Sequence, residues 1–215
     1  MYVRIVALLG AGFVCLLSGC ASSFSKNDMA AFQARAPRSI VVLPAKNDSG
    51  EKNARKVFMP TLAEPLAESG YYVFPLYATE MLFREQGLTD AVQIHQLPPQ
   101  RFYELFGADA VLYITIKDLS TLYLVVYSSV VIDVEYLLKD TRTGAVLWES
   151  RKHIADRSFS LPISPADLLF DAASFYLFTS TRAYARQANY SAFMESDGLH
   201  VGPYHPDYAK RQNAK

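Results

Sequence analysis

The sequence predicts one α/β domain in which a mixed β-sheet is flanked by helices, and three observations support this prediction. Between residues 39 and 107, short apolar runs typical of buried strands alternate with segments of helical spacing. From residue 111 to 153 the apolar period changes to two, which is typical of antiparallel strands. After Ser164 the helical period returns with a broad apolar stripe. The resulting order, β-α-β-α-α-β-β-β-α, favours helices packed on a mixed sheet.

The first half of the domain supplies alternating strands and helices. Residues 40–43 form a continuous apolar run closed by Pro44, which suits a buried central strand. The helical spacing of residues 54–69 conflicts with Pro60, so we expect a helix that breaks and restarts there. The other elements expected in this half are a strand at 71–74 after a helix-ending Gly70, a short helix capped by Thr79 that stops at Gly87, and a helix from Pro99 to Gly107.

The second half reads as strands followed by a helix. A strand is expected over 111–118, and a long β-branched and aromatic run follows at 122–138. Turn chemistry at 140–144 predicts that residues 146–153 return antiparallel. Ser164 followed by Pro165 is typical of a helix start, so we expect the last helix to begin there.

The first twenty residues have the layout of a cleaved lipoprotein signal. Arg4 precedes an apolar run that is too short to span a bilayer as a helix. The run ends in a sequence that matches the bacterial lipobox, formed by Leu17, Ser18, Gly19 and Cys20. In such a signal the cysteine becomes the acylated N-terminus, and two or more acyl chains hold a protein firmly on a membrane. The alternative is an ordinary signal peptide with a coincidental cysteine.

These features divide the chain into four parts. We expect a signal peptide over 1–19, a lipidated tether over 20–38, the α/β domain over 39–197 and a C-terminal tail over 198–215. The tether is predicted to be flexible because its residues are small and polar. Ala21 replaces the aspartate of the inner-membrane retention signal, which implies lipid anchoring at the outer membrane.

Charge and cysteine content narrow the function classes. The chain has 21 Lys and Arg against 21 Asp and Glu, so its zero net charge gives no indication of nucleic-acid binding. Of its two cysteines, Cys15 lies in the predicted signal and Cys20 would be blocked by its lipid. The mature chain is therefore expected to have neither a disulfide nor a free thiol.

Neither a catalytic site nor a metal site nor a cofactor is predicted. The chain lacks nucleophile-elbow, phosphate-loop and paired-cysteine motifs. Asp133 and Glu135 would lie on one face of a strand, a spacing open to acid–base work but more typical of a solvent face. His200 and His205 in the tail, with Asp207 nearby, are a weak candidate metal site because no further ligands are evident.

One stretch is apolar on both faces of its predicted strand and lies near a hairpin end. Such a strand is either buried in the centre of a sheet or exposed for a partner. Burial in the core is the plainer interpretation; an interface of a dimer or assembly is the main alternative, and insertion into lipid the least favoured. The residues of this candidate interface are Leu122, Tyr123, Leu124, Val125, Val126 and Tyr127.

Several motifs together resemble a known family over nearly the whole chain. They are Leu43-Pro44 with Asn47-Asp48-Ser49, residues 70–75 (GYYVFP), residues 106–112 (FGADAVL), residues 140–148, and residues 202–206 (GPYHP). The chain is similar to proteobacterial outer-membrane lipoproteins of unknown function that include a meningococcal surface antigen candidate. The resemblance implies a fold like the N-terminal domain of TolB and a role beside a lipoprotein similar to the curli secretion channel. It assigns a role to Cys20 alone.

Two hypotheses of different class follow. The first is a non-enzymatic outer-membrane lipoprotein that acts through protein contacts, as a homodimer or beside a curli-secretion-like lipoprotein in an envelope assembly or transport complex. The second is a periplasmic binding module for a small envelope ligand such as a glycan or lipid fragment. A flat apolar patch would favour the first hypothesis, and a concave pocket lined by tyrosines would favour the second. An enzyme would require a cluster of His and carboxylate side chains.

Overall fold

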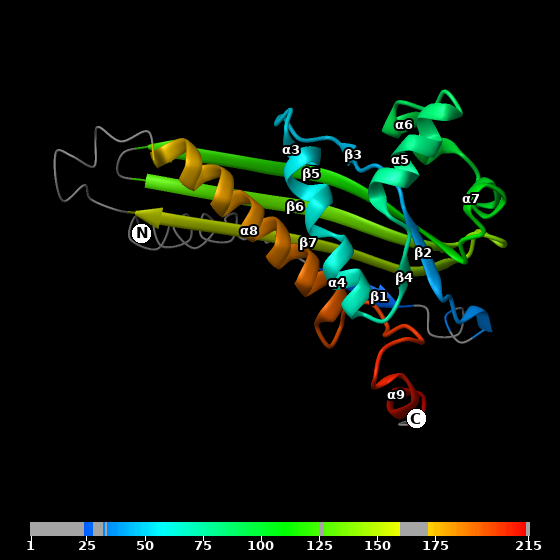
Figure 1. The fold of residues 1–215 in the computed structure, drawn as a ribbon. Helices are drawn as coiled ribbons and strands as arrows, with labels where there is room; N and C mark the ends of the chain where they lie inside the picture. The colour runs from blue at the N-terminus through cyan, green and yellow to red at the C-terminus, as the bar shows by residue number, and fades with distance from the viewer. Residues whose placement is uncertain (1–23, 28–31, 33, 125–126, 160–171, 214–215) are drawn as a thin grey trace, which may run out of the picture.

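A mixed sheet runs through the centre of the computed structural model, which describes residues 24–27, 32, 34–124, 127–159 and 172–213 (Figure 1). Its strand order is β1-β7-β6-β5-β2-β4, and β3 pairs with β5 as well. The antiparallel part consists of β1 (Phe24–Asn27), β5 (Ala110–Leu124), β6 (Tyr127–Asp140) and β7 (Val146–Phe159). The parallel part adds β2 (Ser39–Val42), β3 (Lys46–Asn47) and β4 (Tyr72–Val73). The predicted mixed α/β fold is confirmed.

Helices cover both faces of the sheet. One layer comprises α3 (Ala54–Phe58), the 3₁₀ helix η1 (Met59–Thr61), α4 (Ala63–Glu68) and the long α8 (Ala172–Met194). The other comprises α5 (Leu76–Glu85), α6 (Ala91–Gln96) and α7 (Pro99–Phe106), and α9 (Tyr208–Asn213) follows near the C-terminus. Figure 1 shows α5, α6 and α7 gathered at one end of the sheet, while α8 follows the long strands toward the other end.

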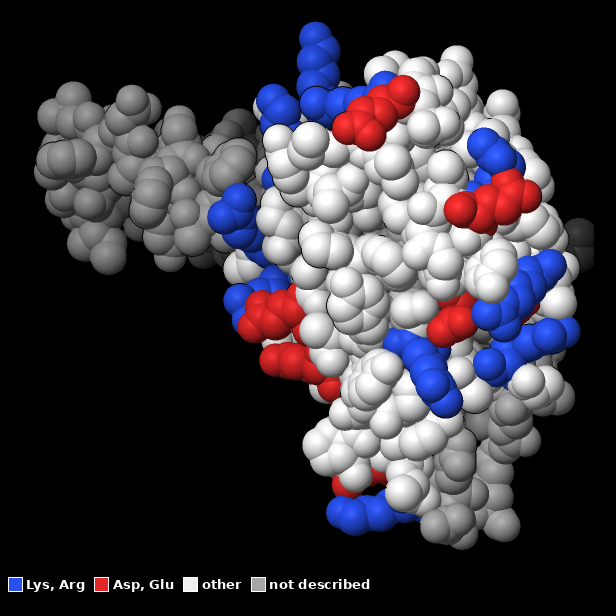
Figure 2. Space-filling model, turned by 45° about the vertical axis from the view of Figure 1, so that its right-hand side comes forward, with Lys and Arg blue, Asp and Glu red and all other residues white. Residues whose placement is uncertain are grey.

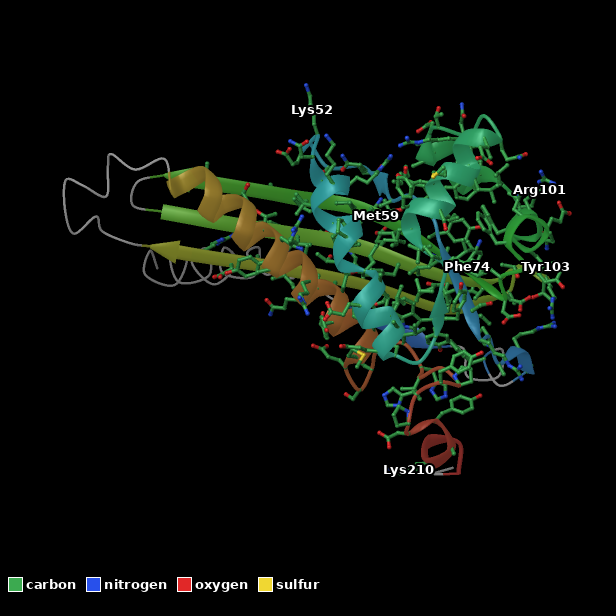
Figure 3. The ribbon with its side chains drawn as sticks, in the orientation of Figure 1. Lys52, Met59, Phe74, Arg101, Tyr103 and Lys210 are labelled. Carbon is green, nitrogen blue, oxygen red and sulfur yellow. The ribbon has the colours of Figure 1, made fainter. Side chains whose placement is uncertain are left out.

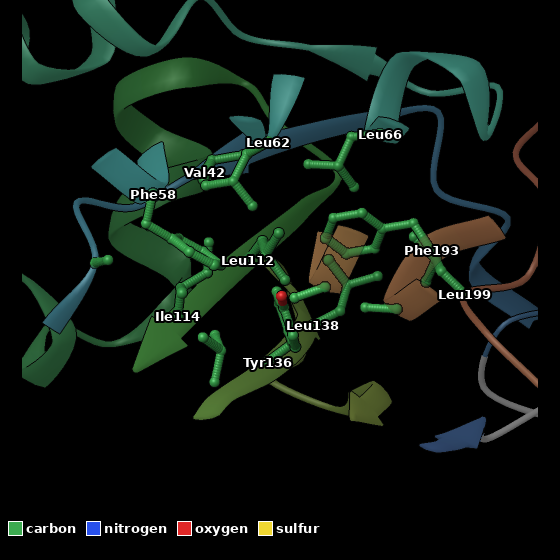
Figure 4. Packing of buried hydrophobic residues seen from close by; sticks show 14 of the residues in the cluster. Val42, Phe58, Leu62, Leu66, Leu112, Ile114, Tyr136, Leu138, Phe193 and Leu199 are labelled. Carbon is green, nitrogen blue, oxygen red and sulfur yellow. The ribbon is translucent and has the colours of Figure 1, made fainter. Parts of the chain in front are cut away.

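The larger core lies between the sheet and the layer that contains α8 (Figure 4). Alternate residues of β6 point into it, and Tyr136 contacts Trp148 and Phe193 with ring centroids 5.9 and 5.4 Å apart. A smaller core lies on the opposite face, where Val41 and Val111 of the sheet meet Phe83 and Phe102 of α5 and α7. Apolar burial on both faces explains why β2 is a continuous apolar run and not an alternating one.

The helix expected over 54–69 breaks as predicted. The α3 helix ends at Phe58, η1 carries Pro60, and α4 resumes at Ala63. Gly70 ends the segment with a left-handed φ of +87°, a conformation that glycine adopts without a Cβ penalty. Gly107 ends α7 in the same way, with φ +67°.

The helix expected to start at Thr79 begins earlier. Pro75 precedes the first turn of α5, and Thr79 lies inside the helix, where its hydroxyl donates to the Pro75 carbonyl at 3.1 Å. The fixed φ of proline favours a helix start at this point. A further helix, α6, was not expected; Asp90 caps it by accepting a hydrogen bond from the Val92 N–H at 3.2 Å.

The run at 122–138 was expected to form one strand, but the structure divides it between two strands. Its first part completes β5, and β6 begins at Tyr127, so the chain reverses between residues 124 and 127. The long antiparallel pair lets both segments bury alternate residues under α8. The predicted helix start at Ser164 lies outside the described residues, whereas the apolar stripe expected after it falls partly within α8.

Two segments outside the expected domain bounds belong to its structure. Residues 24–27, expected to be part of a flexible tether, form β1 and pair with β7, from Phe24 opposite Arg151 to Asn27 opposite Trp148. Backbone hydrogen bonding at a sheet edge does not need an apolar sequence, so composition gave no indication of this strand. The tail also packs on the domain, with Leu199 and Val201 buried.

Candidate binding surface

The segment from residue 72 to 81 presents large apolar side chains to solvent. Tyr72 of β4 is 54% exposed, and Tyr77 and Met81 of α5 are 74% and 43% exposed. Pro75 separates strand from helix, and the three side chains follow one another within ten residues around this junction. Because exposed apolar residues gathered together are unusual on a monomer surface, this segment is the first candidate for a contact site.

Aromatic contacts extend this surface toward α7. The ring of Phe74 lies edge-on to Tyr72 at 5.2 Å and to Phe106 at 5.9 Å, measured between centroids. Tyr103, one turn before Phe106 on α7, is 39% exposed. Figure 2, turned so that the right-hand side of Figure 1 comes forward, shows a broad uncharged area with Lys, Arg, Asp and Glu at its borders. We call the residues Tyr72, Phe74, Tyr77, Met81 and Tyr103 the aromatic face.

A groove of about 360 Å³ adjoins the aromatic face, between η1 and the first turn of α5. It lies beyond the carboxyl end of β2, the region where open α/β sheets commonly bind ligands. Figure 3 shows Met59 on the helix layer that borders it. The lining residues are Val42, Pro44, Arg55, Lys56, Met59, Pro60, Leu76, Tyr77 and Glu80.

The groove has an apolar floor and a charged rim. Arg55 is held by a hydrogen bond from its Nε to the Ala45 carbonyl at 3.0 Å, and Lys56 beside it is exposed. Glu80 on the opposite wall forms an ion pair with Arg84 at 3.9 Å. A groove of this size with mostly apolar walls and a few polar groups is typical of a small-molecule site.

His95 supports the wall of the groove from behind. Its Nε2 lies 3.0 Å from the Pro44 carbonyl, and its ring packs edge-on against Tyr113 at 5.4 Å. Burial lowers the pKa of His95, and the hydrogen bond to Pro44 opposes that shift only in part. The neutral ring, with its proton on Nε2, is therefore the form that the fold favours.

Asp133 and Glu135 do lie on one face of β6, and both are engaged by cations. Arg151 donates to both carboxylate oxygens of Asp133, at 2.8 and 2.6 Å, and its Nη1 lies 3.5 Å from Glu135. Lys117 lies 3.4 Å from Glu135 and 3.1 Å from Asp48. Burial raises the pKa of Asp133, but the hydrogen bonds and charge of Arg151 outweigh it, so the net shift is downward. A carboxylate held ionised in this way is typical of a structural ion pair.

The candidate interface at 122–127 falls at the end of the β5–β6 hairpin. Leu122 is 51% exposed, which is against its burial in a sheet centre. Tyr123, Leu124 and Tyr127 belong to the paired strand ends, with Leu124 opposite Tyr127. Val125 and Val126 lie outside the described residues.

The weak metal candidate in the tail and the lipobox are the remaining sequence candidates. Within the described residues, no three His, Cys, Asp or Glu side chains are grouped so that they could hold a metal ion. His205 instead accepts a hydrogen bond from the Asp207 N–H at 3.0 Å through its Nδ1. Leu17, Ser18, Gly19 and Cys20 are not among the described residues, so the lipobox stays a prediction. Among the described helices, none has the length and apolar character to cross a bilayer.

Sequence reasoning missed the aromatic face. Residues 71–74 were expected to form a strand ended by Pro75, with no expectation of a contact surface, yet only two of them form β4, and Tyr72 on this edge strand is exposed. The signal that could have found it is three tyrosines and a phenylalanine within seven residues, interrupted by Pro75.

The fold and the surface define the class first: a mixed α/β domain with an exposed apolar face. The family model described as "Putative lipoprotein GNA1162-like" matches residues 27–162, and the chain belongs to this family. The protein described as "Putative lipoprotein NMB1124/NMB1162" of Neisseria meningitidis serogroup B (strain ATCC BAA-335 / MC58) is 36% identical over 152 residues, which are 70% of this chain and 71% of the relative. The expected family resemblance is thereby confirmed.

The solved structure of a relative supports the fold. The crystal structure of lipoprotein GNA1162 from Neisseria meningitidis has a TM-score of 0.53 at 33% identity, covering 67% of this chain and 99% of that one. The PelC dodecamer from Paraburkholderia phytofirmans has a TM-score of 0.46 at 15% identity, covering 79% of this chain and 94% of that one. The PelC likeness is too distant to indicate a function. Membership of a lipoprotein family implies membrane anchoring.

Proposed function

We propose that this chain is an outer-membrane lipoprotein, anchored by acyl chains on Cys20, that acts through protein contacts in an envelope assembly or transport complex and catalyses no reaction. The observation that supports this most is the aromatic face, whose five residues are large, apolar and partly exposed. Exposed aromatic and methionine side chains are enriched at protein interfaces. The partner would be another envelope lipoprotein, such as one similar to the curli secretion channel, or a second copy of this chain.

Burial of this face would contribute favourable free energy to a specific contact. Fully burying one large apolar side chain contributes about 1.5–3 kcal/mol. Tyr77 and Met81 are exposed on the same helix, so a partner that covers α5 would bury both. The membrane anchor would add to this by confining both partners to one surface.

A small-ligand module is the second candidate function, and the groove favours it. The groove is concave, but only one tyrosine, Tyr77, lines it, while Val42, Met59 and Leu76 make its floor apolar. An apolar floor suits a lipid fragment better than a glycan, whose hydroxyls would need hydrogen-bonding partners.

The aromatic face is tested by two charge substitutions. Tyr77→Glu and Met81→Glu are expected to abolish recovery of the partner when the acylated protein is cross-linked in mild detergent, affinity-purified and examined by mass spectrometry. A carboxylate in a desolvated contact costs far more than it does in water. Gln86→Glu, at an exposed position just after α5, is the matched control and should retain the partner.

The results of these experiments distinguish the protein-contact function from ligand binding and test the acyl anchor separately. Recovery of the wild-type protein alone, even after cross-linking, would contradict the contact function and favour ligand binding at the groove. Release of Cys20→Ser into the soluble fraction is expected if the acyl chains are the anchor, and retention on the membrane would contradict the anchor.

A further inference from the structure

Two cations at the rim of the groove have no carboxylate partner within the part of the chain that the structure describes. Arg55 and Lys56 follow each other on α3, and both line the groove. Arg55 donates from its Nε to the Ala45 carbonyl at 3.0 Å, which holds the guanidinium in place and leaves its two terminal nitrogens for another partner. The carboxylate of Asp48, on the loop before α3, pairs with two lysines instead.

The acidic residue of the rim does not cancel this charge. Glu80 lies on the opposite wall and has Arg84 as its partner, with Nη2 and Oε2 3.9 Å apart. The charged side chains that line the groove are therefore two cations without a carboxylate partner among the described residues and one carboxylate that already has a cation beside it. An anion at the Arg55 side of the rim would meet positive charge.

The floor between these charges is hydrocarbon. Val42 and Pro44, at the carboxyl end of β2, form its base, and Met59 and Leu76 stand on either side. Pro44 has no N–H, and the Nε2 of His95 already lies 3.0 Å from its carbonyl oxygen. A polar group placed on this floor would lose its hydration without gaining a hydrogen bond. The part of a ligand that lies here should therefore be an apolar chain.

The volume of the groove limits the length of that chain. A methylene group occupies nearly the same volume as a molecule of liquid water, which is about 30 Å³. A groove of about 360 Å³ therefore accommodates one chain of about twelve carbons and no second chain of that length.

We infer that the groove binds a single-chain anionic amphiphile, with its acyl chain on the floor and its carboxylate or phosphate at Arg55 and Lys56. A guanidinium fixed through its Nε presents both terminal nitrogens as a fork, which matches two oxygens of a carboxylate or phosphate. A fatty acid and a lysophospholipid share this chemistry. The site gives the second candidate function its ligand class and does not depend on the contact function, since the groove and the aromatic face have only Tyr77 in common.

Photo-cross-linking of the acylated full chain tests this site. The chain is reconstituted into phosphatidylcholine vesicles and irradiated with dodecanoate that carries a diazirine near its methyl end, at a concentration below saturation. Mass spectrometry then locates the labelled residues. Arg55→Gln removes the fixed guanidinium, and Lys56→Gln, at an exposed position, removes a charge and leaves the hydrogen bond to Ala45 intact. Arg101→Gln is the matched control, because Arg101 is exposed on α7 and Figure 3 shows it apart from Met59.

The label is expected on Met59 and Leu76. Arg55→Gln should reduce it about ten-fold or more, because hydrogen bonds to a charged group are among the strong ones. Lys56→Gln should reduce it less, and Arg101→Gln should leave it unchanged. Label on neither Met59 nor Leu76, or equal labelling of Arg55→Gln and Arg101→Gln, would overturn the inference.

Competition by unlabelled amphiphiles identifies the source of the ligand. Displacement of the probe at a lower concentration by dodecanoate than by dodecanoyl-lysophosphatidylglycerol would assign a fatty acid, and the opposite order would assign a lysophospholipid. Dodecyltrimethylammonium has the same chain length and a positive head group, so it should displace the probe at least about ten-fold less well, and displacement equal to that by dodecanoate would overturn the inference. Recovery of a protein partner by a chain whose groove takes no label would overturn this inference alone and leave the contact function standing.

Discussion

At His95, burial and a hydrogen bond shift the pKa of the imidazole ring in opposite directions. Burial lowers the pKa, because a charged imidazolium loses its hydration, whereas the Pro44 carbonyl favours the protonated ring. The downward shift is the net result. A histidine whose pKa is lower in the folded chain than in the unfolded chain binds fewer protons when folded, so it makes stability depend on pH.

Acidification is therefore expected to destabilise the fold through His95. Above the unfolded pKa of about 6.5 the residue contributes no pH dependence. As the pH falls from there toward the lower folded pKa, the free energy of unfolding decreases by up to about 1.4 kcal/mol per pH unit. Urea unfolding at pH 7 and pH 5 measures this loss. His95→Gln should show a smaller loss than the wild type, and an equal loss in both would show that other groups control the effect.

Among the elements, α8 is fixed by polar contacts as well as by apolar packing. The Tyr136 hydroxyl of β6 donates to the Asn189 side-chain oxygen at 2.8 Å. The Asn189 amide donates to the Thr61 hydroxyl at 2.8 Å, and that hydroxyl donates to the Phe58 carbonyl at 2.7 Å. This chain of hydrogen bonds joins the sheet, α8 and η1 inside the core.

Removing the Asn189 amide is expected to destabilise the domain by about 1–3 kcal/mol, since it leaves buried hydroxyl groups without partners. The substitution Asn189→Ala is expected to lower the free energy of unfolding by this amount, and urea denaturation measures the difference from the wild type. Gln187→Ala, exposed on the same helix, is the control and should change stability by no more than about 0.5 kcal/mol. A loss as small for Asn189→Ala as for the control would show that water replaces the amide.

Elements with strong local signals could be predicted from the sequence. Pro60, Gly70 and Gly107 fixed helix breaks and ends because their backbone constraints act locally. The β1 strand and the Asn189 hydrogen bonds could not be predicted, because each depends on a partner far along the chain. The hairpin turn between residues 124 and 127 was missed because no glycine, proline or asparagine interrupts the β-branched run there.

The candidate site was harder to predict than the fold. The stretch at 122–127 was correctly placed near a hairpin end, but apolar sequence alone could not separate core from contact surface. The exposure of the aromatic face depends on which strand lies at the edge of the sheet. The strand order places β4 there, and the sequence does not indicate that order. Edge position in the folded sheet therefore decides the exposure of Tyr72.

At the scale of the whole molecule, two sequence motifs more than 120 residues apart contact each other and hold the C-terminal segment on the domain. Residues 70–75 and 202–206, both part of the family resemblance, meet where the Gly202 N–H donates to the Ser69 carbonyl at 2.7 Å and the Tyr204 N–H donates to the Gly70 carbonyl at 3.1 Å. The Tyr71 hydroxyl, buried, donates to the His200 carbonyl. The C-terminal segment is therefore held against the start of the strand that leads into the aromatic face.

This crossing should not tolerate a side chain at Gly202. A Cβ there would lie 2.3 Å from the Gly70 carbonyl oxygen and 2.9 Å from the Tyr71 ring, so one backbone segment has to move. Gly202→Ala is expected to destabilise the domain by about 1–3 kcal/mol, as overpacking does elsewhere. It should also speed proteolysis after residue 198, because the segment loses its hydrogen bonds to Ser69 and Gly70. Gly50→Ala, with open space around its Cβ, is the control and should change neither quantity. Stability and cleavage unchanged in Gly202→Ala would mean that the C-terminal segment does not rest on Gly70, and that the aromatic face is positioned without it.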